Sequence, residues 1–251
     1  MRAVKIPMVP DQLILEDMMK TEQRRFRNAG IIPLGMDYAT VDFSEIDINR
    51  AGSLSLLGDT QMQLQFVKGF LQILAHNIVF HNVEMMIVDD RQKSLKSAGA
   101  YGFVKEYTSD SGEGMALMEE FYDELNRRQE DDVFELSTIM LVINHPDVFR
   151  QICSDKNMAK KLSGALKRAN DRKAFILLTQ IENVPVGFNA SEALKTIREE
   201  KQGILFAPIT ENKFYEVSGR VKDDSFFDRT MGYRFDNGSY SRIKLFEQTG
   251  G

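Results

Sequence analysis

The chain has 251 residues, of which 43% are hydrophobic and 27% are charged, and its 32 Lys and Arg against 37 Asp and Glu give a net charge of −5. These values are those of a globular protein and exclude a wholly disordered chain. The length fits one large domain or two small ones. The excess of acidic residues disfavours sequence-independent binding to nucleic acid. A single cysteine, Cys153, excludes an intrachain disulfide framework, and three scattered histidines indicate no metal centre.

The N-terminal sequence MRAVKIPMVPDQ lacks the apolar stretch of a secretory signal. No apolar run approaches the ~18 residues that a membrane-spanning helix needs. The free Cys153 agrees with a reducing, cytosolic setting. We therefore expect a cytosolic domain, or a cytosolic piece of a larger protein.

Short apolar runs alternate with amphipathic segments along most of the chain. Five runs predict buried strands, and they are Ser53–Leu57, Met85–Val88, Ile139–Ile143, Phe175–Thr179 and Ile204–Ala207. Helical spacing of apolar residues predicts helices between them, and these cover Met62–Phe80, Met115–Leu125, Asn157–Arg168 and a segment from Ser191, as its N-cap, through Lys201. The pair Asn237-Gly238, between two alternating segments, predicts a β-hairpin.

Continuous apolar strands separated by helices are typical of a mostly parallel central sheet with helices on both faces. The sequence therefore predicts one α/β domain. We place it at residues 31–251, after an N-terminal arm or linker at residues 1–30.

The junction of the first strand with its helix lies where a phosphate-binding P-loop would be found. A P-loop has the pattern G-x-x-x-x-G-K-[ST], whereas residues 58–65 read GDTQMQLQ. Gln63, Leu64 and Gln65 replace the second glycine, the phosphate-binding lysine and the Mg²⁺-binding hydroxyl residue. A side chain opposes the backbone geometry of an anion nest, hydrocarbon cannot neutralise phosphate, and an amide is a poor Mg²⁺ ligand. Each lost charged hydrogen bond costs roughly 1.5–3 kcal/mol.

Two interpretations of this junction stay open. It is either an ordinary strand-to-helix turn or a degenerate nucleotide site, whose residues would be Gly58, Asp59, Thr60, Gln61, Met62, Gln63, Leu64 and Gln65. A nucleotide site also needs an acidic residue after a buried strand, to order Mg²⁺ and the attacking water. The run MMIVDD offers Asp89 and Asp90, and IMLVINH offers Asn144. Polar residues also begin many ordinary loops, and the spacing does not tell which strand lies beside the junction.

Taken in order, several segments resemble the FtsK/SpoIIIE-type ATPase domains of the type VII secretion coupling proteins EssC and EccC. The resemblance rests on IIPLGMDYATVDFSEIDINRAGSLSLLGDTQ for the opening and the P-loop strand, VEMMIVDD for the second strand, STIMLVINHPDVF for the Walker B strand, FILLTQIENV for the sensor strand and GYRFDNGSYSRIKLF for the terminal hairpin. Asn144 then matches the Walker B aspartate, with Asp147 following it. Thr179 and Gln180 match the polar pair that closes the sensor strand. The ordered set of segments is specific, although no single motif is.

The resemblance implies a RecA-like P-loop NTPase fold. Because the Walker A lysine and the Walker B aspartate are both missing, it points to the degenerate C-terminal ATPase domain of such a protein. It implies no catalytic residue, no metal site and no required cofactor. ATP with Mg²⁺ would bind at most weakly, in a cleft made by residues 58–65, Asn144, Thr179 and Gln180.

The resemblance also implies partners and a location. The partners are secreted helical proteins of the WXG100 type, upstream ATPase domains of the same polypeptide and other copies in a homo-oligomeric motor, but no nucleic acid. The domain would lie at the cytoplasmic face of the cell membrane, as the soluble C-terminal part of a membrane-anchored protein. Arg168 and Arg172 lie near the place where family members carry an arginine that reaches a neighbouring protomer's nucleotide. Their plainer interpretation is as solvated cations at a helix end.

Three functions stay open. The first is a non-hydrolysing module that recognises secreted proteins and regulates the motor, with the 13 methionines either forming an adaptable apolar surface or filling the core. The second is a working ATPase in which Asp59, Asp89 or Asp90 replaces the lost metal ligand. The third is a DNA-translocating domain, which the acidic balance and the lack of interleaved aromatic and basic residues disfavour.

Overall fold

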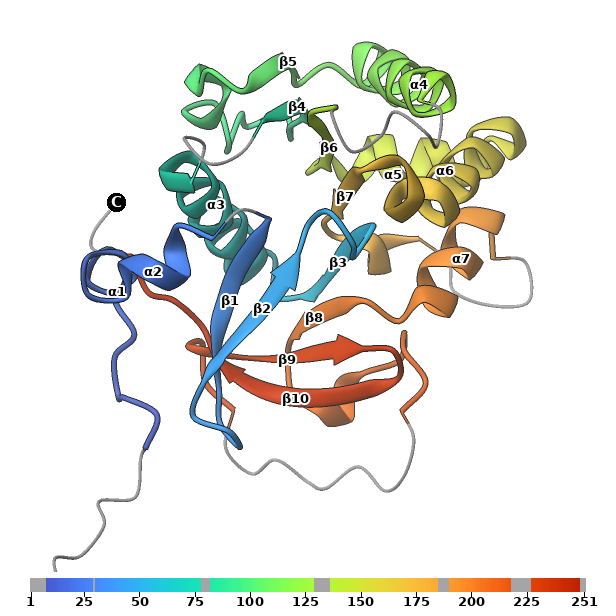
Figure 1. The fold of residues 1–251 in the computed structure, drawn as a ribbon. Helices are drawn as coiled ribbons and strands as arrows, with labels where there is room; N and C mark the ends of the chain where they lie inside the picture. Colours follow the sequence, from blue (N-terminus) through green and yellow to red (C-terminus); the bar gives the residue numbers. More distant parts are fainter. Residues whose placement is uncertain are drawn as a thin grey trace, which may run out of the picture.

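Ten strands form one twisted sheet in a computed structural model of the chain, which describes residues 8–28, 30–77, 82–128, 136–184, 190–217 and 227–248 (Figure 1). The strand order is β2-β1-β10-β9-β8-β3-β7-β6-β4-β5. The strands are β1 Ile31–Asp37, β2 Phe43–Asp47, β3 Ser53–Gly58, β4 Val83–Val88, β5 Val104–Thr108, β6 Thr138–Ile143, β7 Ala174–Leu178, β8 Gly203–Phe206, β9 Met231–Asp236 and β10 Ser239–Lys244. The α-helices are α1 Leu15–Thr21, α2 Gln23–Phe26, α3 Thr60–Asn77, α4 Ser111–Arg127, α5 Pro146–Ser154, α6 Lys156–Ala169 and α7 Glu192–Glu200.

Six neighbouring strands, from β8 to β5, run parallel, and the other four pair antiparallel. The predicted mostly parallel sheet with flanking helices and a C-terminal hairpin is therefore confirmed. All five predicted strands are present, and β6 and β7 are buried along their whole length because both faces are covered. The hairpin turn forms at Asn237 and Gly238, whose φ angles of 49° and 88° are those of a two-residue turn that favours Asn-Gly.

Three strands were not predicted. β2 and β5 are the two edge strands of the sheet, and β5 exposes Lys105 and Glu106, so neither strand is a continuous apolar run. β1 contains Pro33 and Gly35, two residues that are rare inside strands, and its pairing with β2 is irregular between them. Edge strands carry one-sided or polar patterns because solvent replaces one neighbour.

Helices cover both faces of the sheet and bury two apolar clusters (Figure 1). On one face α4, α5, α6 and α7 pack over β6 and β7, and on the other α3 and the N-terminal helices pack over the same strands and β1. The Ser191 Oγ accepts a hydrogen bond from the Leu194 amide at 3.3 Å, which confirms the predicted N-cap of α7. Helix α5 was not predicted; His145 caps it and Pro146 opens it.

Helix α3 begins at Thr60, two residues before the predicted start. Its predicted end at Phe80 lies outside the described residues. Six of the twelve described methionines are buried in the core, namely Met62, Met85, Met118, Met140, Met158 and Met231, and Met18, Met19, Met86 and Met115 pack half-buried against it. Only Met8 is a strongly exposed large apolar residue among those described. The described residues therefore form no exposed methionine surface of the kind considered from the sequence.

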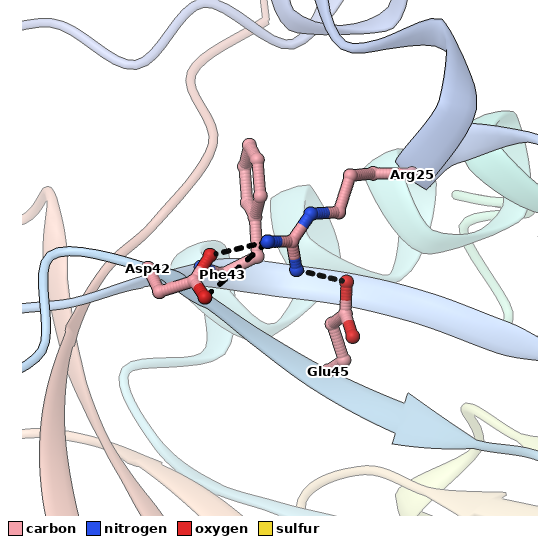
Figure 2. A network of polar contacts seen from close by, with 4 residues as sticks. All are labelled: Arg25, Asp42, Phe43 and Glu45. Atoms are coloured by element: carbon pink, nitrogen blue, oxygen red, sulfur yellow. Dashed lines mark hydrogen bonds and ion pairs between the residues drawn. The ribbon is translucent and has the colours of Figure 1, made fainter.

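The N-terminal helices α1 and α2 pack against the sheet. Leu15 and Phe26 are fully buried in the cluster around α3 and β1. Figure 2 shows Arg25 of α2 reaching over β2, where its guanidinium lies 2.9 Å from Asp42 and 3.3 Å from Glu45. The same group lies over the Phe43 ring, 5.7 Å from its centroid. Exposed ion pairs of this kind stabilise by at most about 1 kcal/mol, so burial of Phe26 holds the arm more firmly than the ion pairs do. The division at residue 30 stays a prediction.

Candidate functional site

The junction of β3 and α3 contains a single residue outside regular structure. β3 ends at Gly58 and α3 begins at Thr60, which leaves Asp59 between them. The Asp59 Oδ1 accepts a hydrogen bond from the Met62 amide at 2.9 Å, and its carbonyl accepts one from the Gln63 amide at 3.0 Å. Residues 60–62 are therefore helical, at the positions where a P-loop wraps around phosphate. An aspartate also occupies the helix N-terminus that would attract an anion.

Gly58 is required by its neighbour β8. Its φ is 89°, and a Cβ atom at this position would lie 2.5 Å from the carbonyl oxygen of Phe206. The Asp59 amide donates to the same carbonyl at 3.0 Å. The close approach of β8 therefore explains the glycine without any phosphate-binding role.

The Gln63 side chain fills the space beside this junction. It is 1% exposed, although it belongs to the second turn of a helix that begins at the surface. Its Nε2 donates to the Gly58 carbonyl at 2.9 Å and to Glu182 Oε1 at 3.4 Å, while its Oε1 accepts from the Gln180 amide at 2.8 Å. Gln63 thus connects the end of β3 to the segment that follows β7.

The other residues of the window point to different surroundings. Met62 is buried in the apolar cluster under α3, and Leu64 packs half-buried against the same cluster. Thr60, Gln61 and Gln65 are exposed. Apart from Asp59, Gln63 is therefore the one residue of this window whose polar side chain forms hydrogen bonds at the carboxyl ends of the neighbouring strands.

Glu182 was missed by the sequence reasoning. It lies in a short 3-10 turn, Ile181–Asn183, directly after Gln180, which has a left-handed φ of 53°. Its Oε1 accepts from the Gly58 amide at 2.7 Å. Burial raises the pKa of Glu182, and the bonds from Gly58 and Gln63 oppose that rise. No local pattern could reveal this residue, because its contacts lie 119 and 124 positions away.

A second group of bonds crosses the carboxyl ends of β7, β6 and β4. The Thr179 hydroxyl donates to Asn144 Oδ1 at 3.0 Å, and the Asn144 Nδ2 donates to Asp89 Oδ1 at 2.9 Å. All three residues are at most 3% exposed. An aspartate at position 144 would place a second carboxylate beside Asp89, and the two negative charges would repel each other. The Asn144 amide instead donates a hydrogen bond to the Asp89 carboxylate. The structure thus brings Asn144, Thr179 and Gln180 together with the junction.

Asp89 is fully occupied as an acceptor. Besides Asn144, it accepts from the amides of Asp90 and Leu95 and from the Tyr107 hydroxyl, each at 2.8 Å. It is 0% exposed. Burial, followed by the bond to Asp89, raises the pKa of Tyr107. Each carboxylate oxygen of Asp89 thus accepts two hydrogen bonds, so neither has a free lone pair with which to bind Mg²⁺.

Two other acidic candidates are also engaged elsewhere. Asp90 accepts from the Ser94 amide and hydroxyl at 3.1 and 2.7 Å. Asp147 forms ion pairs with Arg91 and Arg150 at 3.2 and 2.9 Å. Within the described ranges no group of three or more His, Cys, Asp and Glu side chains could hold a metal ion.

The two arginine candidates lie at the opposite edge of the sheet, near the start of β7. Arg168 donates to the Gly164 carbonyl at 3.0 Å and to Asn126 at 2.6 Å, and it lies over the Tyr122 ring. Arg172 donates to the carbonyl of Arg128. Both therefore join α6 and its following turn to α4, and neither reaches the cleft of its own chain.

A cavity of about 520 Å³ lies beside α3, between that helix, β1 and the C-terminal segment. Its lining includes Met62, Phe66 and Phe70, which follow one another at four-residue spacing along α3. Polar side chains surround this apolar stripe, among them Gln65, Lys68, Arg229, Glu247 and Gln248. Gln63 does not line this cavity, so the β3–α3 junction and the cavity are separate places on the same helix.

No protein-family model matches the sequence, and no curated protein matches it. The fold, in contrast, matches solved structures. The cytoplasmic domain of EssC superposes with a TM-score of 0.74 at 17% identity, covering 97% of this chain and 48% of that one. EccC (ATPases 2 and 3) from Thermomonospora curvata, in complex with a signal sequence peptide, gives 0.68 at 14%, covering 99% and 45%. The conjugation coupling protein TcpA, with ATPγS, gives 0.60 at 13%, covering 95% and 70%.

The chain thus spans about half the length of the EssC and EccC structures that it matches. Among the described residues no helix combines the length and apolar character needed to cross a membrane. At these identities the likeness shows the fold. This chain therefore has the RecA-like fold of the EssC and EccC ATPase domains.

Proposed function

We propose that this chain is a non-hydrolysing ATPase-like domain of a type VII protein secretion motor, where it recognises secreted proteins and regulates the motor. The observation that supports inactivity most strongly is the junction itself. Helix α3 begins at Thr60, and Gln63 fills the adjoining space with three hydrogen bonds. A phosphate would have to displace all three bonds and approach the Asp59 carboxylate without a lysine to neutralise it.

The alternative of a working ATPase depends on Asp59, Asp89 or Asp90 as metal ligands. Asp59 caps α3, Asp89 accepts four hydrogen bonds and Asp90 holds Ser94. Each would have to give up a structural role to bind Mg²⁺. The conjugation coupling protein TcpA shares the fold as well, but the net charge of −5 disfavours the DNA-translocating alternative.

The secretion role follows from the likeness to EssC and EccC over nearly the whole chain. The partners we propose are WXG100-type helical proteins, upstream ATPase domains of the same polypeptide and other copies of the motor. The place we propose is the cytoplasmic face of the membrane. The cavity beside α3 has the apolar stripe and polar rim that suit an amphipathic helix, and we assign docking to it.

The first prediction concerns nucleotide. Titration of the chain with a fluorescent ATP analogue in the presence of Mg²⁺ is expected to give no saturable binding up to millimolar concentration, because the phosphate site is filled by Gln63 and faced by Asp59. Competition with unlabelled ATP separates specific binding from adsorption of the dye. Micromolar affinity that unlabelled ATP competes away would restore the ATPase alternative.

The second prediction concerns substrate. A peptide carrying the C-terminal signal of a WXG100-type protein from the same organism is expected to bind, as measured by isothermal titration calorimetry. Gln65→Trp places a large ring at the cavity lining and is expected to weaken binding at least about tenfold, equivalent to about 1.4 kcal/mol. Gln61→Trp is the matched control, since Gln61 is also exposed on α3 but lines no part of this cavity.

The two variants separate the parts of the proposal. Equal peptide affinity in wild type and Gln65→Trp would place docking elsewhere on the domain. An absence of heat with the wild-type protein at high peptide concentration would count against substrate recognition itself.

A further inference from the structure

Gln63 joins two segments that lie far apart in the sequence. Its side-chain amide nitrogen donates a hydrogen bond to the carbonyl of Gly58, the last residue of β3. Its side-chain oxygen accepts one from the backbone amide of Gln180, after β7. Both ends of the side chain are therefore satisfied by the protein, in a position that is 1% exposed. A glutamine on an amphipathic helix ordinarily faces water, so this placement needs a reason beyond helix formation.

Glu182 adds a second connection between the same segments. Its Oε1 accepts hydrogen bonds from the Gly58 amide and from the Gln63 side chain. Its Oε2 is buried without a hydrogen-bond partner among the described residues. Gln180, between Thr179 and this turn, holds a left-handed backbone conformation with φ of 53°. A conformation of this kind persists only where surrounding bonds hold it. The Gln63 bond to the Gln180 amide is the contact placed to do so.

We propose that Gln63 is a built-in substitute for nucleotide, which fixes the segment 179–182 against the end of β3 in one arrangement. The proposal rests on the proposed function, because this segment follows the strand that matches the sensor strand of the resembled ATPases. In such a site a bound phosphate would bridge the two strand ends. Here a side chain makes the bridge permanently, so the domain presents a constant conformation to its neighbours whether or not ATP is present.

The proposal makes Gln63 a positioning residue whose effect is local. The amide of Gln180 reports on it directly, because that N–H donates to the Gln63 Oε1. Native-state hydrogen exchange measures how often this bond opens. The amides of Leu141 and Ile176, in the buried β6 and β7, report opening of the whole domain and separate a local effect from global destabilisation.

Three variants give the test its controls. Gln63→Ala removes the bridge, and Gln63→Met keeps a similar side-chain volume without hydrogen bonds. Both are expected to speed exchange at Gln180 at least tenfold more than at Leu141 and Ile176. Gln61→Ala, at an exposed position two residues earlier in α3, is expected to leave the Gln180 rate within twofold of wild type.

Slow Gln180 exchange in Gln63→Met would overturn the proposal, because packing alone would then hold the segment. If neither Gln63 variant folds, the wild-type protein still tests the idea. Its Gln180 exchange rate is expected to be the same with and without millimolar Mg·ATP, and a change of threefold or more on adding nucleotide would overturn it. Failure of the proposed function is read separately, from saturable binding of the fluorescent ATP analogue to the wild-type protein.

Discussion

Replacing Gly58 by alanine is expected to destabilise the folded chain by about 3 kcal/mol or more. Two costs combine. An alanine with φ of 89° is strained, and its Cβ would lie 2.5 Å from the Phe206 carbonyl oxygen and 2.7 Å from the carbonyl carbon. Backbone atoms of a central strand cannot move aside as the end of a flexible side chain can. The measurement is the free energy of unfolding in urea, followed by circular dichroism.

The matched control is Gly102→Ala, because a Cβ at Gly102 meets nothing within 4 Å. Its free energy of unfolding is expected to stay within about 0.5 kcal/mol of wild type. A Gly58→Ala protein as stable as Gly102→Ala would contradict the close approach of β3 and β8. It would also reopen the possibility that Gly58 is retained for phosphate.

Replacing Asp89 by alanine is expected to cost about 3–5 kcal/mol of unfolding free energy. The substitution leaves four buried or half-buried donors without their acceptor: the Asp90 and Leu95 amides, the Tyr107 hydroxyl and the Asn144 side chain. Loss of one partner from a buried polar network costs more than the net gain from forming it, because the remaining groups stay desolvated.

Asp123→Ala is the matched control for this change. Asp123 is exposed on α4, and its side chain forms no hydrogen bond or ion pair with another described residue, so the expected change is within about 0.5 kcal/mol. An Asp89→Ala protein that unfolds like Asp123→Ala would show that the network is not structural. Asp89 would then be free to serve as a metal ligand, in favour of the ATPase alternative.

The residues at two departures from the ATPase pattern each have hydrogen-bond partners of their own. With Asp89 serving as a buried acceptor for four groups, position 144 needs a donor, which asparagine supplies and aspartate does not. At the junction, Gln63 likewise supplies bonds that glycine lacks. The residues at both departures, Asn144 and Gln63, thus form hydrogen bonds at the carboxyl edge of the sheet.

The sequence by itself determined the elements whose signals are local. Apolar runs marked β3, β4, β6, β7 and β8, helical spacing marked α3, α4, α6 and α7, and Asn237-Gly238 marked the hairpin turn. Such signals are readable because burial on both faces, helix periodicity and turn chemistry each depend on residues that are close in the chain. The edge strands β2 and β5 gave no such signal, because solvent replaces one of their neighbours.

Only the tertiary structure decided which contacts the β3–α3 junction makes. The window GDTQMQLQ permitted both an ordinary turn and a degenerate phosphate loop, and nothing in its eight residues chose between them. The tertiary structure places Phe206 beside Gly58, and Glu182 and Gln180 beside Gln63, in contacts that span more than 100 residues. Strand order sets these contacts, and strand order is fixed by the packing of the whole sheet, which no local pattern records.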